Sequence, residues 1–170
     1  VPNSVAIYTQ PGATGRGIGD CSDEAANLAS IVQNLINTDS YFKTGFSIDT
    51  RITSFAQSNL ADILNQAEVF FMTDMEGSGA TGLTDASRGI VADFVGGGGV
   101  MLMTGTAGGS DAEFLNAVFG WDVSSVECSD ASLNTENAEG TPFEWGSATL
   151  DCPSATDHLN CGSQQCTPIY

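Results

Sequence analysis

Residues 67–106 constrain the fold of this chain more than any other segment, because they read as strand, loop, helix and strand in succession. The runs 68–73 and 100–104 are almost continuously apolar, as is typical of parallel strands buried on both faces. Between them, Thr84 is placed to cap a helix that ends in the glycines 96–99 and carries one apolar stripe, formed by Ile90, Val91, Phe94 and Val95. The segment predicts a right-handed βαβ unit.

The same alternation continues on both sides of this unit. A strand at 4–9, a helix capped by Ser22, a strand at 45–52 and a short helix from Asn59 precede it. The first helix is expected to turn five residues inward, namely Ala25, Leu28, Val32, Leu35 and Ile36, and the second to bury Leu60, Ile63 and Leu64. After the unit, Ser110 and Glu113 form a capping box for a helix that ends at Gly120 and has one apolar face, formed by Phe114, Leu115, Val118 and Phe119.

This order of elements predicts an α/β fold with a three-layer, doubly wound, mostly parallel sheet. We expect residues 1–120 to form the core and the cysteine-rich residues 121–170 to form a lateral extension of the same domain. Within the extension, 122–128 is a candidate edge strand and 141–145 a second extended piece. No charged leader precedes the first strand, so we expect a mature product or an excised domain.

The charge of the chain limits its partners. Four basic residues stand against 21 acidic ones, and the net charge of -17 excludes nucleic acid as a partner because it repels polyphosphates. No apolar run approaches the roughly 20 residues that span a bilayer, so membrane insertion is not expected. The same charge suits a soluble, well-solvated surface.

The cysteines indicate an oxidising, extracellular or cell-surface location. Cys21 stands at a helix start, and the other four crowd a loop-like region with little core of its own: Cys128, Cys152, Cys161 and Cys166. We expect disulfides among these five, with one cysteine buried unpaired or linking subunits. A zinc site is the alternative, but the chain has no C-x-x-C pair, and its only histidine, His158, has no second histidine at ligand spacing.

The turn after the second strand of the βαβ unit is where a reactive side chain is expected, because chemistry in open parallel sheets usually lies at the carboxyl ends of the strands. That turn reads Gly105, Thr106, Ala107, Gly108 and Gly109, without a strong nucleophile. The motifs VAIYT, AEVFFMTDMEG, GLTDASRGIVADFVGGGGVMLMTGT and DAEFLNAVFGW together resemble the class I glutamine amidotransferase-like fold. Within it, FLNAVFGW and GTPF-x-x-x-x-ATL are similar to secreted bacterial domains of unsettled role.

The resemblance implies a nucleophile elbow G-x-C-x-G, and Ala107 occupies the nucleophile position. It also implies a late histidine with an acidic partner, whereas His158 lies among the cysteines. In similar domains further strands follow the position of Ile169 and Tyr170, and this resemblance implies a sheet that is either truncated or completed by a partner. The sequence therefore argues against amidotransferase catalysis.

Several other residues are candidates for binding. The carboxylates of Asp20, Asp23, Asp74 and Glu76 follow strands expected at one sheet edge, and they are candidate Ca²⁺ ligands, although no D-x-D-x-D-G loop is present. Solvated helix caps are the alternative, and no other cofactor is expected. Arg16 lies in a glycine-rich loop that matches neither G-x-G-x-x-G nor a P-loop, and it is a candidate interface cation. Trp121 and Trp145 are candidate interface anchors or core residues.

These observations favour a non-catalytic extracellular subunit that interacts with itself and assembles into a filament or surface layer. Two alternatives remain open. The first is a carbohydrate-binding or adhesion module, in which Trp121 or Trp145 stacks on a glycan. The second is a hydrolase with an unorthodox site built from Asp74, Glu76 or Thr106.

Overall fold

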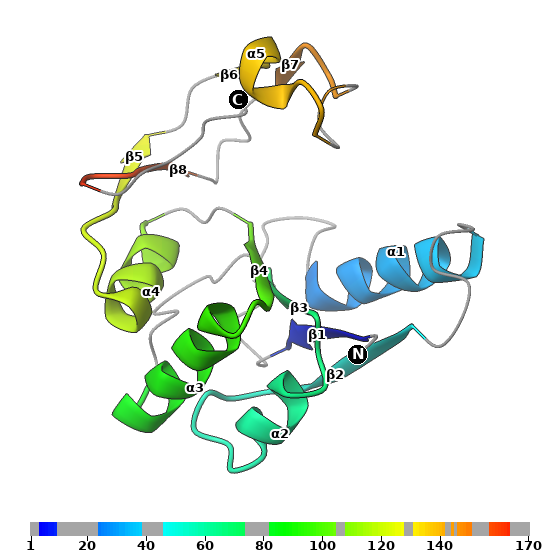
Figure 1. The fold of residues 1–170 in the computed structure, drawn as a ribbon, viewed down its shortest axis with the longest axis vertical. Helices are drawn as coiled ribbons and strands as arrows, with labels where there is room; N and C mark the ends of the chain where they lie inside the picture. Colours follow the sequence, from blue (N-terminus) through cyan, green and yellow to red (C-terminus); the bar gives the residue numbers. More distant parts are fainter. Residues whose placement is uncertain are drawn as a thin grey trace.

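Four parallel strands in the order β2-β1-β3-β4 form the centre of the computed structural model (Figure 1). The structure describes residues 4–9, 24–38, 46–73, 82–104, 108–127, 131–141, 144, 146–150 and 157–163. Its first eight elements alternate as the sequence predicts: β1 (Ser4–Tyr8), α1 (Glu24–Thr38), β2 (Ser47–Ile52), α2 (Leu60–Leu64), β3 (Val69–Met72), α3 (Asp85–Gly96), β4 (Val100–Met103) and α4 (Ser110–Phe119). The prediction of an α/β fold with a parallel sheet is confirmed.

Helices cover both faces of the sheet. On one face, α1 packs its Ala25, Leu28 and Val32 against alternate residues of β1 and β3, namely Val5, Ile7, Val69 and Phe71. On the other face, α2, α3 and α4 enclose the main core with the intervening strand residues Ala6, Tyr8, Phe70 and Met72. This division follows from the pleat, because successive strand side chains point to opposite faces. The strand order reverses direction between β1 and β3, as in doubly wound sheets.

Aromatic rings fill the centre of the main core. The rings of Tyr8 and Phe55 stack with their centroids 4.5 Å apart, and Phe114 of α4 lies against Phe55 at 5.2 Å. All three side chains are almost completely buried. Burial raises the pKa of the Tyr8 phenol well above its usual value.

The helix ends agree with the sequence at α3 and differ at α4. Thr84 caps α3, accepting the backbone N–H of Ser87 at 3.1 Å while the Ser87 hydroxyl accepts the N–H of Thr84 at 2.8 Å. The predicted capping box of Ser110 and Glu113 is wrong, because Ser110 is the first residue of α4 and Gly109 is its N-cap. Gly109 has φ 78°, a left-handed conformation that favours glycine, so the helix starts directly after it. Gly120 ends α4 as expected.

The described residues after α4 form small separate elements, and none of them adds a strand to the main sheet. β5 (Ser124–Glu127) pairs antiparallel with β8 (Asp157–Asn160), and β6 (Ala131–Ser132) pairs with β7 (Thr149–Leu150), next to the short helix α5 (Thr135–Ala138). The predicted edge strand is therefore a strand, but its described partner is β8. The predicted extended piece at 141–145 is wrong at its start, because the Glu144 N–H donates to the Thr141 carbonyl at 3.1 Å in a turn.

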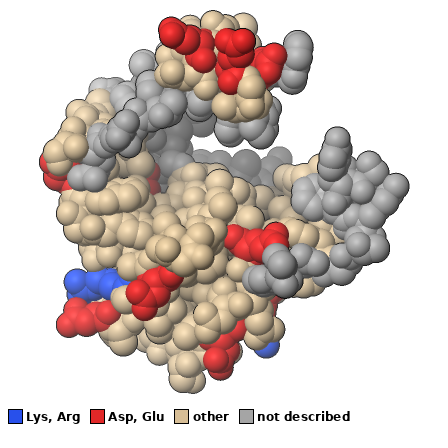
Figure 2. All heavy atoms as spheres, in the orientation of Figure 1, with Lys and Arg blue, Asp and Glu red and all other residues tan. Residues whose placement is uncertain are grey.

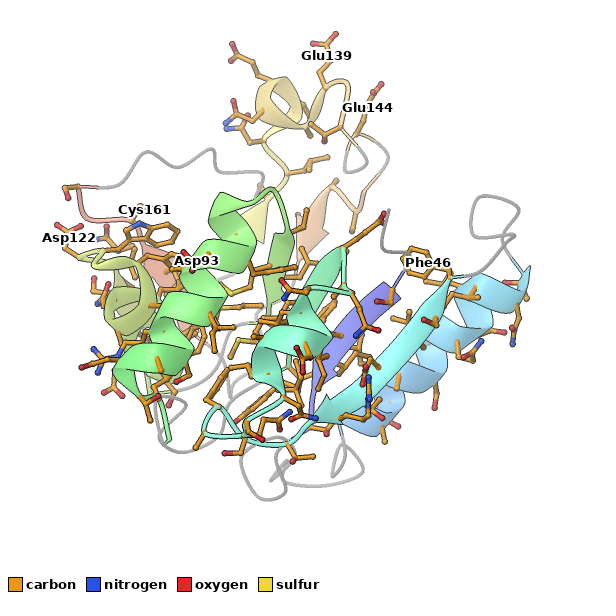
Figure 3. The ribbon with its side chains drawn as sticks, turned by 60° about the horizontal axis from the view of Figure 1, so that its bottom comes forward. Phe46, Asp93, Asp122, Glu139, Glu144 and Cys161 are labelled. Carbon is orange, nitrogen blue, oxygen red and sulfur yellow. The ribbon has the colours of Figure 1, made fainter. Side chains whose placement is uncertain are left out.

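One close contact ties β5 to the end of β8. Asp122 and Cys161 lie on the same side of the molecule in Figure 3. Oδ1 of Asp122 accepts both the backbone N–H and the hydroxyl of Ser163, each at 2.9 Å. Gly162, at φ 56°, packs so tightly that an added Cβ would lie 2.4 Å from the Asp122 carbonyl oxygen. The β5-β8 pair in turn packs on α4, where Leu159 and Val123 contact Leu115.

Candidate functional site

The candidate site is the exposed edge of strand β4. We define this β4 edge as the outward backbone groups of Met101 and Met103 together with the side chains of Val100 and Leu102. β4 pairs with β3, and no other described strand pairs with it. The Val100 N–H donates to the Glu68 carbonyl at 2.9 Å and the Thr104 N–H to the Met72 carbonyl at 3.1 Å. Since alternate residues of a strand direct their N–H and C=O groups to opposite sides, those of Met101 and Met103 point away from β3. Such a row is a template for another strand.

One face of β4 is covered and the other is open. Met101 and Met103 are half-buried against the core and α4. Val100 is 50% exposed and Leu102 is 44% exposed, although the register sets them beside Val69 and Phe71 on the α1 face. α1 makes its main strand contacts with β2 and β1, at the other side of the sheet (Figure 1). The expectation that the run 100–104 is buried on both faces is therefore wrong, because β4 is an edge strand that α1 does not cover.

α1 leaves an apolar flank beside this open face. The flank that borders β2 is polar and includes Ser30, Gln33 and Asn37. Ile31 and Leu35, one turn apart, lie on the opposite flank and are largely exposed. The prediction that Leu35 faces inward is wrong, because the inward stripe centres on Leu28 and Val32 and leaves Leu35 at its border.

At the opposite edge of the sheet, side chains occupy the outward backbone groups of Arg51 on β2. The Arg51 N–H donates to Oδ1 of Asp49 at 2.9 Å, and the Gln57 side-chain amide donates to the Arg51 carbonyl at 3.1 Å. Nε of Arg51 also donates to both oxygens of Asp49, at 2.9 and 3.0 Å. The hydrogen bonds and charge of Arg51 lower the pKa of the Asp49 carboxyl. Charges and capped backbone groups on an edge strand oppose pairing with another strand.

The carboxyl ends of the strands, where sequence reasoning expects chemistry, carry hydroxyl groups among the described residues. Each of the four strands of the main sheet is followed directly by a threonine, and these are Thr9, Thr53, Thr73 and Thr104. The Thr9 hydroxyl donates to the Thr50 carbonyl at 2.9 Å. The Thr73 hydroxyl is buried and has no hydrogen-bond partner among the described residues. These groups can donate and accept hydrogen bonds.

Most of the residues singled out from the sequence lie outside the part of the chain that the structure describes. These are Arg16, Asp20, Cys21, Asp23, Asp74, Glu76, Gly105, Thr106, Ala107, Cys128, Trp145, Cys152, Cys166, Ile169 and Tyr170. Gly108 and Gly109 are described, and both have left-handed backbone conformations. Trp121 is 40% exposed and stacks on Phe119 with ring centroids 4.7 Å apart. It is therefore a surface residue whose ring packs on one side against Phe119. Cys161 is disulfide-bonded.

Sequence reasoning missed the contrast between the two sheet edges. One available signal was the alternation of Asp49 and Arg51 in a short strand, which places opposite charges on the same face of an edge. Another signal was that residues 100–103 carry no charge. The segments after residue 120 contain few apolar residues, which does not favour a further buried strand beside residues 100–103. Whether such a segment pairs with β4 or with a distant strand depends on tertiary contacts that a local pattern does not contain.

Comparisons with protein-family models, curated proteins and solved structures find no match to this chain. The resemblance to the amidotransferase-like fold therefore stays a prediction. Among the described residues, no group of three or more histidine, cysteine or acidic side chains is arranged to hold a metal ion. No helix in the described ranges has the length and apolar character needed to cross a membrane.

Proposed function

We propose that this chain is a non-catalytic, extracellular structural or interaction subunit that assembles with copies of itself into a filament or surface layer through the β4 edge. The observation that carries the proposal is the combination, on one strand, of outward-pointing backbone groups at Met101 and Met103 with exposed apolar side chains at Val100 and Leu102. Strands of this kind tend to pair with other chains unless charge, proline or a bulge opposes it, and β4 has no charge or proline.

Two further observations support the other parts of the proposal. Ala107 stands where the resembled enzymes carry their cysteine nucleophile, and an alanine methyl group cannot attack a carbonyl. The disulfide-bonded Cys161 favours an oxidising compartment, since disulfides are rare in the cytosol.

A matched pair of variants tests the assembly. Val100→Lys places a charge on the β4 edge, and Val126→Lys makes the same substitution on β5, where Val126 is 37% exposed. Both variants change the net charge by the same amount. We expect negative-stain electron microscopy, at high protein concentration with disulfides intact, to show filaments or layers for the unmodified chain and for Val126→Lys, and dispersed particles for Val100→Lys. Dispersed particles for the unmodified chain, with or without Ca²⁺, would contradict the proposal.

Trp121 favours a second candidate function, a carbohydrate-binding or adhesion module. Its ring is partly exposed and is held by the stacking contact with Phe119. Aromatic rings presented in this way suit stacking on the apolar face of a sugar. This candidate predicts glycan binding by dispersed particles, which the assembly proposal does not require.

A further inference from the structure

The two edges of the sheet, β2 and β4, differ in whether their outward backbone groups are already hydrogen-bonded. This difference favours one way for two copies of the chain to pair. At β2, the N–H and C=O of Arg51 are already bonded to the side chains of Asp49 and Gln57. At β4, the corresponding groups of Met101 and Met103 have no described partner strand. Head-to-tail growth of the sheet requires β4 of one copy to pair with β2 of the next, and the Asp49, Arg51 and Gln57 side chains would first have to leave their hydrogen bonds.

We propose that β4 of one copy pairs antiparallel with β4 of a second copy across a twofold axis, with Val100 of each copy opposite Leu102 of the other. This inference rests on the proposed function and deepens it, because it names the surface of the second copy that β4 meets. A twofold contact uses the same patch on both copies, so a single open edge is sufficient.

The backbone geometry limits the possible registers, and the exposed side chains of Val100 and Leu102 favour one of them. A twofold axis perpendicular to the sheet keeps each face on its own side, so residues opposite one another must point to the same face, and Val100 cannot lie opposite Met103. With Met101 opposite the same residue of the second copy, the outward N–H and C=O groups of the two residues bond to one another. Val100 then lies opposite Leu102 in the non-hydrogen-bonded positions, where side chains approach most closely. The two exposed apolar residues of each copy are thus paired.

Charge makes this strand the most favourable place for two copies to touch. The net charge of -17 opposes any association of copies, and Figure 2 shows acidic side chains spread over the molecule, including the segment around α5. β4 itself carries no charged residue. Salt screens repulsion between exposed charges, with a Debye length of about 8 Å at physiological ionic strength, and leaves apolar contact intact. The pairing should therefore strengthen as salt rises.

Two double variants, both substituted at Val100 and Leu102, test the register. In V100K/L102E, each Lys lies opposite a Glu of the other copy, whereas in V100K/L102K each Lys lies opposite a Lys. Opposite charges at facing positions stabilise a strand pair and like charges destabilise it. Sedimentation equilibrium at several salt concentrations, with circular dichroism to verify folding, should give V100K/L102E a dimer dissociation constant at least about tenfold below that of V100K/L102K. Equal dissociation constants for the two folded variants would overturn the inference.

The unmodified chain provides a second measurement that needs no variant to fold. Amide hydrogen exchange at Met101 and Met103 should slow at least about tenfold as the concentration is raised through the dimerisation range, while exchange at 47–52 stays unchanged, since strand pairing protects only the amides it engages. Protection at β2 with none at β4 would overturn the inference. Because a twofold pair closes on itself, filaments need a second contact surface. Filaments without β4 protection would refute the pairing and the role of the β4 edge but leave self-assembly standing. Dimers paired at β4 that never grow would support the pairing and refute assembly into filaments or layers.

Discussion

The backbone N–H of Arg51 donates to Oδ1 of Asp49 at 2.9 Å, so that one carboxylate binds both the edge backbone and the guanidinium of the same residue. The two side chains are two positions apart on β2 and therefore lie on one face of the strand. This arrangement stabilises the local strand and occupies a donor that another strand would need. The sheet thus has one edge that its own side chains close.

The Asp49 carboxylate should make stability depend on pH in the acid range. Its pKa is lowered in the folded chain by Arg51, so its contribution is present above the usual carboxyl pKa of about 3.9 and is lost as the pH falls through the folded value. We expect Asp49→Asn to lower the urea unfolding midpoint slightly at pH 7, and we expect the difference from the unmodified chain to vanish once the pH falls below the lowered pKa of the folded chain. Asp93→Asn, which removes an exposed charge from α3, is the control. A difference that persists unchanged into acid would contradict the assignment.

The aromatic cluster of Tyr8, Phe55 and Phe114 should dominate core stability. Phe55 contacts both other rings, so Phe55→Ala leaves a cavity between β1 and α4. We expect a loss of about 3–5 kcal/mol in the free energy of unfolding, as for other buried phenylalanines. Phe46→Ala, at a half-buried position beside α1, should cost clearly less in the same urea titration. Equal losses would show that the cluster is not the centre of the core.

The capping box of α3 should contribute about 1 kcal/mol, because the Thr84 hydroxyl accepts a helix N–H that otherwise lacks a partner. Thr84→Ala is expected to lower the thermal midpoint measured by circular dichroism. Thr84→Ser keeps the hydroxyl and should restore most of the loss. If Thr84→Ser were as unstable as Thr84→Ala, the methyl group would be the important part of the side chain.

Gly162 should tolerate a side chain less well than Gly140, because only Gly162 packs closely against Asp122. Both have left-handed backbone conformations, with φ 56° and 73°, but a Cβ at Gly162 would lie 2.4 Å from the Asp122 carbonyl oxygen, whereas nothing lies within 4 Å of one at Gly140. Gly140→Ala should therefore cost about 1–2 kcal/mol from backbone strain alone, and Gly162→Ala clearly more. Limited proteolysis of the β5-β8 pair, together with urea unfolding, measures the difference. Similar losses would show that the Asp122 contact relaxes.

Trp121 provides the test between the two proposed functions. If the chain is a carbohydrate-binding module, a glycan array should show binding that falls at least about tenfold in Trp121→Ala and much less in Trp121→Phe, since the second variant keeps an aromatic face over Phe119. The assembly proposal expects no such binding. Val126→Lys, on neighbouring β5, serves as the surface control.

The order of the first eight elements was predictable because each carries its own local signal: apolar runs for β1, β3 and β4, an apolar stripe for α3, and glycines at the ends of α3 and α4. The two errors about burial have one cause. Leu35 and the run 100–104 were interpreted as buried from hydrophobicity alone, but their exposure depends on which strands α1 covers. Likewise, β5 has strand character in the sequence, and its pairing with β8 depends on residues 30 to 36 positions away.

The candidate site was less predictable than the fold for a related reason. The glycine-rich turn and its missing nucleophile are visible in the sequence, whereas the open edge of β4 follows from the lack of a second neighbouring strand in the part of the chain that the structure describes. Strand composition alone does not tell a central strand from an edge strand, because both are apolar when one face packs on a core.

Closure of β2 by Asp49, Arg51 and Gln57 also has a consequence for stoichiometry. When two copies join at β4, both ends of the combined sheet are β2 strands, and each end is already terminated by its own side chains. A third copy can then extend the sheet only by displacing these side chains from their hydrogen bonds. The side chains of β2 thereby oppose growth of the joined sheet beyond two copies. They do so although β2 lies at the opposite edge of the sheet from β4, where the copies meet.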